Sequence, residues 1–295
     1  MEHPIGYDLV RQVKDKEFSI DDLTHYDLLL LVGEGIFQLC VIDARTDTCV
    51  TVEEYAFPKG ASPEPPDQAV AHLFEGHTYL MAGYWRSVRL AIRNSSFTLV
   101  PSPFFSNSKL SELLTHSAAA DKTHDGYYYY AHTQSDAVMV FAAQKKLVER
   151  IRSFYPSLKV PVVHHGSALI EGIQSNRNFT YYRDMYLHVG QGKLSVVVTQ
   201  DNNLVLYNQF QYAYTQDLVK YTRGVMQQLE MDPSENQVTL WGNIPERSPH
   251  FQTLYRYIKN IGYGGRPAFL KFSNAFDELP NYRLFDLYSL YVCEA

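Results

Sequence analysis

One short pattern occurs twice in this chain, about half the protein apart. Residues 30–41 read LLVGEGIFQLCV and residues 187–198 read LHVGQGKLSVVV. In each copy an apolar run meets a Gly-x-Gly, a second apolar strand follows, and a polar turn leads to a third strand. One constant shift relates Gly33 and Gly35 to Gly190 and Gly192. A duplicated three-strand unit predicts two similar lobes with a cleft between them.

Composition limits the class of protein before any other motif is considered. A chain of 295 residues, 45% hydrophobic and 20% charged, is long enough for one large or two medium domains. The net charge of −6 argues against a general nucleic-acid binder, which needs a concentrated positive field. The densest basic cluster (Lys145, Lys146, Arg150 and Arg152) falls on one predicted helix and indicates a solvated face.

Neither the start of the sequence nor the cysteines carry a pattern that indicates export, a membrane or an oxidising compartment. Residues 1–8 lack the basic and apolar regions of a signal peptide, and the longest apolar run, 28–32, is too short to span a bilayer. Cys40, Cys49 and Cys293 form neither a disulfide framework nor a CxxC site. We therefore expect a cytoplasmic protein with reduced thiols and no membrane span.

Hydrophobic periodicity predicts the same order of elements in both halves of the chain. In residues 1–176 a polar lead-in (1–26) precedes strands from 28 to 57, a helix at 67–84, a strand at 87–93, a strand–helix–hairpin insert at about 97–143, a helix at 144–155, a strand at 160–163 and a helix at 167–174. In residues 177–295 the pattern predicts strands at 185–199 and 204–212, a helix at 215–230, a strand at 238–241, a helix at 249–260, a strand at 268–272 and a short terminal helix. The order β-β-β-α-β-α-β predicts an α/β fold of two ribonuclease-H-like lobes with mixed sheets.

Two segments resemble the actin-like ATPase superfamily, in particular its pilus-assembly and cell-division branch. Residues 138–148 (VMVFAAQKKLV) resemble the strand and helix that follow the inserted subdomain there, and 160–163 leading into 167–170 (SALI) resembles its inter-lobe connecting helix. The LVP at 99–101 and the YRLFDL at 282–287 further resemble a bacterial family of unassigned function, domain-of-unknown-function family 3822, which is expected to have this fold.

The resemblance implies a nucleotide site, and this sequence departs from it at each mapped polar position. Actin-like ATPases hold Mg-nucleotide with an aspartate in each first strand, in the form D-x-G. The mapped positions are Leu31 and His188, and neither side chain is a good ligand for a hard cation. Val163-His164-His165 occupies the place of the acidic residue that orients water, and the Gly-Gly of the adenosine side is reduced to Gly242-Asn243, beside the bulky Trp241.

We therefore interpret these segments as a vestigial site in the cleft. The phosphate-loop residues would be Leu31, Gly33, Glu34, Gly35, His188, Gly190, Gln191 and Gly192, and the adenosine-side residues would be Trp241, Gly242 and Asn243. Turn geometry alone accounts for the glycines, since glycine tolerates φ > 0 and close packing.

The sequence His164-His165-Gly166-Ser167 is the remaining cluster of reactive side chains. Adjacent histidines on a strand-to-helix turn could supply a metal ligand or a general base. No second cluster has metal-like spacing, so we expect no metal site, and Ser167 is explained more simply as a helix N-cap. Asp43, Asp47 and Asp201 fall in predicted hairpin turns, where aspartate is favoured by local hydrogen bonding.

Four consecutive tyrosines, Tyr127 to Tyr130, put two aromatic rings on each face of a predicted strand in the insert. One face could be an exposed patch that binds a partner, because the inserted subdomain of actin-like assembly proteins often makes the partner contacts. A strand buried on both faces would explain the same residues.

The leading hypothesis is a non-catalytic actin-like protein that has lost ATP hydrolysis, needs no cofactor and works by binding another protein. The alternative is a divergent ATPase or small-molecule kinase that uses ATP and magnesium in the cleft, with Glu34, Gln191 and Asp201 taking over the metal and phosphate contacts. A third possibility is a metal hydrolase centred on His164 and His165.

Overall fold

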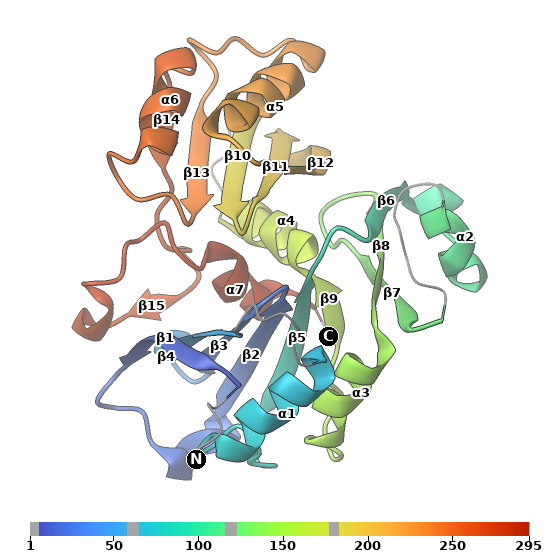
Figure 1. Cartoon of the computed structure of the whole chain (residues 1–295), viewed down its shortest axis with the longest axis vertical. Helices are drawn as coiled ribbons and strands as arrows, with labels where there is room; N and C mark the ends of the chain where they lie inside the picture. The colour runs from blue at the N-terminus through green and yellow to red at the C-terminus, as the bar shows by residue number, and fades with distance from the viewer. Residues whose placement is uncertain (1–5, 58–64, 116–122, 177–182, 295) are drawn as a thin grey trace.

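The computed structural model describes residues 6–57, 65–115, 123–176 and 183–294. Two lobes each contain a mixed sheet, and helix α4 (His165–Ser175) lies between them (Figure 1). A smaller three-stranded module stands beside the first lobe, where the sequence predicts an insert. The predicted α/β architecture of two lobes with mixed sheets is therefore confirmed.

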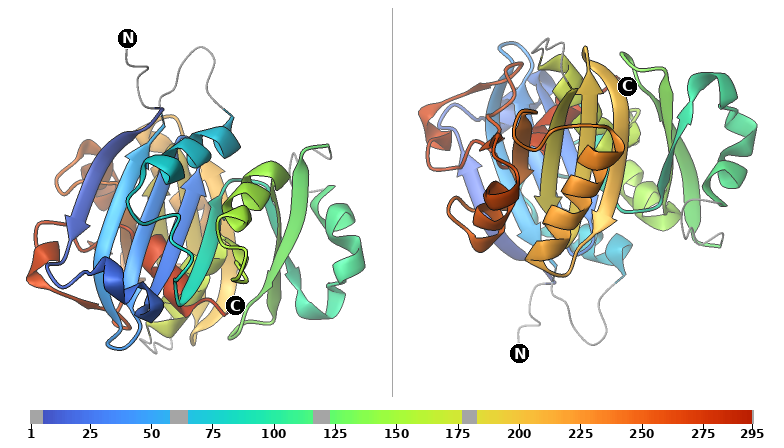
Figure 2. Two further views of the ribbon diagram at one scale, coloured as in Figure 1. Left: turned by 90° about the horizontal axis from the view of Figure 1, so that it is seen from below. Right: turned by 90° about the horizontal axis from the view of Figure 1, so that it is seen from above.

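The first lobe is built on a seven-stranded sheet of order β1-β4-β3-β2-β5-β9, with β15 added beside β4. Its strands are β1 (Asp8–Lys14), β2 (Tyr26–Gly33), β3 (Ile36–Asp43), β4 (Thr48–Ala56), β5 (Ser87–Arg93), β9 (Val162–His164) and β15 (Lys271–Phe272). Helices α1 (Pro66–Gly76) and α3 (Lys145–Ser153) cover one face, while α4 and α7 (Phe285–Ser289) cover the other (Figure 2). Because both faces are covered, β2 and β3 are almost continuously apolar.

Two predicted boundaries in this lobe are wrong. The supposed lead-in contains β1, an edge strand antiparallel to β4, whose exposed and half-buried residues carry too weak an apolar alternation to be recognised. The first helix ends at Gly76 instead of continuing to residue 84. The chain turns there because His77 and Tyr79 reach back to the buried carboxylate of Glu53.

The inserted module has the predicted strand, helix and hairpin. Its strands β6 (Phe97–Pro101), β8 (Ala137–Gln144) and β7 (Asp125–Ala131) pair antiparallel in that order, and α2 (Leu110–Thr115) packs on them. The hairpin end of the module is tied to α4, because His132 Nδ1 lies 2.8 Å from Glu171 Oε1 and the Thr133 hydroxyl donates to Glu171 Oε2 at 2.8 Å.

The second lobe repeats the strand order of the first. Its sheet has the order β12-β11-β10-β13-β14, which matches β4-β3-β2-β5-β9 strand for strand. The elements are β10 (Arg183–Gly190), β11 (Lys193–Gln200), β12 (Asn203–Gln211), α5 (Thr215–Gln228), β13 (Val238–Gly242), α6 (Pro249–Tyr257) and β14 (Ile261–Tyr263). Helices α5 and α6 lie side by side on the outer face of this sheet (Figure 2).

The chain returns to the first lobe at its C-terminal end. β15 pairs in parallel with β4, and α7 packs against α4, β2 and β3. The sequence pattern assigns residues 177–295 to the second lobe. The last of these residues belong instead to the first sheet and to the seam between the lobes. The predicted strand at 268–272 is reduced to two paired residues. The predicted boundary at Asn176 follows α4 directly, and residues 177–182 lie outside the described part of the chain.

Two further features of the fold concern the cysteines and the lengths of the helices. Cys40, Cys49 and Cys293 are buried and free, with Cys40 Sγ 3.4 Å from Cys49 Sγ. Within the four described ranges, no helix has the length and apolar character needed to cross a membrane.

Candidate functional site

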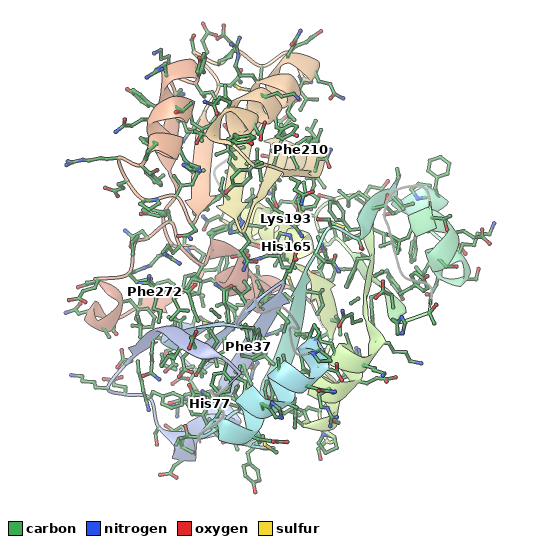
Figure 3. The ribbon with its side chains drawn as sticks, viewed as in Figure 1. Phe37, His77, His165, Lys193, Phe210 and Phe272 are labelled. Carbon is green, nitrogen blue, oxygen red and sulfur yellow. The ribbon has the colours of Figure 1, made fainter. Side chains whose placement is uncertain are left out.

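A cavity of about 180 Å³ lies where the two lobes meet. The first lobe contributes side chains from β3, β4 and β5, and the second contributes the β10–β11 turn and the end of β13. The segment from Arg283 to Asp286, which leads into α7, closes the cavity. Figure 3 shows His165 and Lys193 at this junction, between the sheet of the first lobe and that of the second.

Asp286 joins the two lobes across the cavity. Its carboxylate is ion-paired to Arg93 at the end of β5, and Oδ1 lies 3.3 Å from Nε2 of His188 in β10. His165 Nδ1, at the start of α4, lies 4.0 Å from the other carboxylate oxygen. The Asp286 side chain is 1% exposed. One buried anion therefore holds a cation of the first lobe and a histidine of the second.

The charges around Asp286 determine its protonation state. Burial by itself raises the pKa of this carboxyl, but Arg93 and His188 favour the charged form and lower the pKa well below its usual range. The pKa of the neighbouring His165 is also well below its usual value, because burial, His164 and the positive charge of Arg93 all disfavour the charged imidazole. At neutral pH the cluster therefore contains an ionised Asp286, a charged Arg93 and a neutral His165.

Glu54 in β4 is the other carboxylate in the cavity lining, and it is also paired. Gln38 Nε2 donates to Oε2 at 2.8 Å, Arg11 Nε donates to Oε1 at 2.9 Å, and an Arg283 guanidinium nitrogen lies 3.4 Å from both oxygens. Asn243 in turn accepts from Arg283 at 3.2 Å. The two acidic side chains of this cavity are thus engaged by arginines from β1, β5 and the segment before α7.

The phosphate-loop residues predicted in the first lobe lie outside the cavity. Leu31 is fully buried and pairs in register with Gln38, so it faces α7 on the same side of the sheet. Gly33 pairs with Ile36, and Glu34 is exposed in the β2–β3 turn. Gly35 has φ of 73°, which supports the interpretation of this glycine as a turn residue.

The second copy of the hairpin does reach the cavity. His188, Gly190 and Gln191 line it, and Gly192 closes the β10–β11 turn with φ of 72°. Turn geometry therefore explains Gly35 and Gly192 in the two equivalent hairpins. Asp201 lies in the β11–β12 turn, at the opposite end of β11 from Gln191. The structure thus does not bring Glu34, Gln191 and Asp201 together.

On the predicted adenosine side, only the residues after Trp241 line the cavity. Gly242 and Asn243 do so, and a Cβ on Gly242 would lie 2.1 Å from the carbonyl oxygen of Val189. Trp241 points away into the core, where its ring stacks 3.9 Å from that of Phe285 and its Nε1 donates to Gly265 at 2.9 Å. The tryptophan therefore anchors α7 instead of filling the cavity.

His164 has a structural role in this fold. His164 Nδ1 accepts from the backbone N–H of Gly166 at 3.1 Å, and Nε2 lies 3.1 Å from the carbonyl oxygen of Asn94. His164, and not Ser167 as predicted, is therefore the N-cap of α4, which begins two residues earlier than expected. Across the described part of the chain, no group of three or more potential ligand residues could hold a metal ion.

The tyrosine strand borders a separate groove of about 480 Å³ between the insert and the first lobe. Tyr128 packs on Phe141 with ring centroids 5.6 Å apart, and the Tyr130 hydroxyl accepts from the backbone of Glu294 at 3.2 Å. Tyr129 is 44% exposed and lies against Phe105. Tyr130 is therefore buried, Tyr127 and Tyr128 are half-buried and Tyr129 is exposed, so neither a fully exposed face nor a strand buried on both faces describes the segment.

Sequence reasoning did not find the residues that close the inter-lobe cavity, namely Gln38, Glu54, Arg93, Arg283 and Asp286. One signal was available: polar residues at 38, 54 and 93 interrupt otherwise apolar strands. Asp286 lies inside the YRLFDL segment that carried a family resemblance, but nothing in the local pattern points to a partner at residue 93.

Comparison with known proteins shows which family this chain belongs to. The model of the DUF3822 family, described as proteins of unknown function, matches residues 15–261. The chain belongs to the DUF3822 family. No curated protein matches the sequence.

Solved structures show the fold of this DUF3822 protein. A Bacteroides thetaiotaomicron protein with an actin-like ATPase fold and unknown function superposes with a TM-score of 0.77 at 18% identity, covering 94% of this chain and 99% of that one. A chain of the PilM–PilN type IV pilus biogenesis complex superposes with a TM-score of 0.60 at 13% identity, covering 90% and 97%. The fold is that of the actin-like ATPases, as the resemblance implied.

Proposed function

We propose that this DUF3822 protein is a non-catalytic member of the actin-like fold that binds another protein. The observation that carries the proposal is the state of the inter-lobe cavity, where Glu54 and Asp286 are both held by arginines. A magnesium ion needs oxygen ligands that are free to coordinate it or its bound waters. The two carboxylates here would have to give up their partners first.

The remaining features of the cavity do not fit a magnesium–nucleotide complex either. The mapped aspartate positions hold Leu31, which is fully buried, and His188, which faces Asp286. A volume of about 180 Å³ is also below the roughly 300–1,000 Å³ of common small-molecule sites. The residues present therefore do not suit the group that this fold usually holds, and we derive no reaction through it.

The groove beside Tyr129 is the surface that we assign to the protein partner. It combines exposed aromatic area with the cationic side chains Arg152 and Lys159, and β7 is the edge strand of its sheet. Aromatic and arginine side chains are enriched where proteins meet. The related fold in the PilM–PilN complex, which is itself a protein–protein assembly, supports a role in binding for this chain.

Thermal unfolding with and without millimolar MgATP and MgADP tests the loss of the nucleotide site. A ligand at about 100 times its Kd would stabilise the folded state by about 2.7 kcal/mol, which moves the midpoint by a few degrees. We expect no shift with either nucleotide. A shift of that size, together with ATP hydrolysis that is lost in Gln191→Ala, would instead support the divergent ATPase.

Site-specific photo-crosslinking tests the partner groove. A benzoylphenylalanine at position 129 should yield a discrete crosslinked protein in the cells that make this chain. The same group at Tyr84, which is 72% exposed between α1 and β5 of the first lobe, is the matched control. The groove assignment fails if position 129 gives no product or if both positions give the same one.

A further inference from the structure

A second groove lies on the far lobe, between the outer surfaces of α5 and α6. It has a volume of about 750 Å³ and is separate from both the inter-lobe cavity and the tyrosine groove. The two helices lie side by side at the end of the molecule farthest from the first lobe (Figure 1). Each contributes one stripe at helical spacing, from Gln216 to Gln227 on α5 and from Thr253 to Tyr257 on α6.

The walls of the groove are positively charged. Lys220, Arg223 and Arg256 line it, and its lining, within the described part of the chain, contains no carboxylate. Neither arginine forms an ion pair with a described residue. Lys220 Nζ lies 5.6 Å from the centroid of the Tyr221 ring and interacts at longer range with Asp217. This local excess of positive charge contrasts with the net charge of −6 of the whole chain.

Apolar side chains lie at the bottom of the groove, and a glycine on α5 leaves one side of it open. Half-buried Val219 lines the bottom of the groove above the buried Met226 and Met231, and Tyr257, 45% exposed, stands at the rim. A Cβ on Gly224 would meet no atom within 4 Å, so the groove is open at the middle of α5.

We propose that this groove binds an acidic, amphipathic helical segment of a partner protein. A third helix fits between two packed helices, with apolar residues against Val219 and Tyr257 and carboxylates opposite the three cations. From Gln216 to Gln227 the α5 stripe is about 16 Å long, at 1.5 Å per residue, which accommodates about three turns of the partner. The apolar bottom of the groove favours such a helix over a nucleic acid, whose backbone would bring charge without an apolar face.

Selection from a phage-displayed library of random 14-residue peptides tests this proposal. The library is selected in parallel on the wild-type chain and on the double variant Arg223→Glu/Arg256→Glu. We expect the wild type to enrich peptides with Glu or Asp alternating with apolar residues at helical spacing, and the variant not to enrich them. The strongest peptide is then measured by fluorescence polarisation at low and high salt.

Two variants separate an effect of the groove from a general effect of charge. Gly224→Trp fills the groove without changing the charge, and should weaken the selected peptide at least tenfold while the protein stays folded by thermal unfolding. Lys146→Glu/Arg150→Glu reverses two exposed cations on α3 and should leave binding unchanged.

Several results would overturn the proposal. One is selection of peptides without acidic bias, and another is equal enrichment on the charge-reversed variant. Tighter binding of a single-stranded oligonucleotide than of any peptide would assign the groove to nucleic acid. Self-association that the double reversal abolishes would assign it to a second copy of this chain. The ATP and crosslinking tests of the proposed function concern other surfaces, so neither outcome decides the other.

Discussion

At the scale of single residues, His164 shows how burial determines the chemistry of a reactive side chain. It is fully buried, its Nδ1 caps α4, and its Nε2 donates to the carbonyl oxygen of Asn94. Burial lowers its pKa to about 3, although the hydrogen bond to Asn94 acts in the opposite direction. A histidine that remains neutral down to this pH holds the helix end in place and is unsuited to take up protons near neutral pH.

We expect the stability of the protein to decrease as pH falls below about 6.5, partly because of His164. The unfolded chain binds a proton at this residue with a pKa of about 6.5, whereas the folded chain does so only near 3, so acid favours unfolding across that interval. His164→Asn should therefore lose about 2 kcal/mol less than the wild type between pH 7 and pH 5. Urea unfolding at the two pH values measures the difference.

The exposed His25 provides the control for this measurement. His25→Asn should leave the decrease in stability between pH 7 and pH 5 the same as in the wild type. An equal decrease in His164→Asn and wild type would show that His164 is protonated in the folded state.

At the scale of elements, one buried carboxylate connects three separate segments of the first lobe. Glu53 in β4 accepts from Gln12 of β1 at 2.8 Å, from Tyr55 at 2.5 Å and from Tyr79 at 2.7 Å, and His77 Nε2 lies 2.8 Å away. Burial raises its pKa, but the hydrogen bonds outweigh that effect and bring the pKa to about 2. This side chain explains why β1 stays on the sheet edge and why the chain leaves α1 at Gly76.

Glu53→Gln should destabilise the protein by about 3 kcal/mol, because one amide oxygen cannot replace two carboxylate oxygens for four donors. The wild type should lose this stabilisation as pH falls from about 4.3, the pKa of an unfolded glutamate, towards 2. Urea unfolding at pH 7 and pH 3 should therefore show a difference between variant and wild type that shrinks in acid.

Glu75→Gln, an exposed change on α1, is the matched control and should alter stability by less than about 0.5 kcal/mol. A Glu53→Gln protein as stable as this control would mean that the four donors find other partners.

At the scale of the whole molecule, the seam between the lobes is a packed and charged interface. Helices α4 and α7 approach so closely that a Cβ on Gly172 would lie 2.5 Å from Cβ of Ser289. Beside them Asp286 links Arg93 of the first lobe to His188 of the second. This arrangement predicts that the two lobes are held together without a nucleotide between them.

Asp286→Asn should cost about 3 kcal/mol, because it leaves the guanidinium of Arg93 buried without an anion. Amide hydrogen exchange should become faster at the ends of both β5 and β10, which belong to different lobes. Arg93→Leu/Asp286→Leu should cost clearly less than the sum of the single changes, because a buried ion pair can be replaced by apolar side chains.

Asp277→Asn, an exposed change that follows the short 3-10 helix 274–276, should leave both readouts as in the wild type. Additive costs for Arg93 and Asp286, or faster exchange in one lobe alone, would argue against a link across the cavity.

The order of elements along the chain and the insert could be predicted from sequence because their signals are local. The alternation of apolar and polar residues in strands and the placement of Gly, Pro and Asp in turns depend on neighbouring residues. The duplicated hairpin indicated two similar lobes, and the structure has two equivalent sheets. The edge strand β1 was missed because an exposed strand has little apolar alternation to detect.

The closure of the cavity could not be predicted in this way. Arg93 and Asp286 are 193 positions apart, and their pairing depends on the return of the C-terminal segment to the first lobe. The sequence itself shows that Leu31 and His188 stand at the two positions to which the resemblance maps the aspartates. Long-range packing decides which charged side chains lie in the cavity, and it turns Trp241 into the core beneath α7. The burial of an ion pair or of an aromatic ring depends on all the elements that surround it.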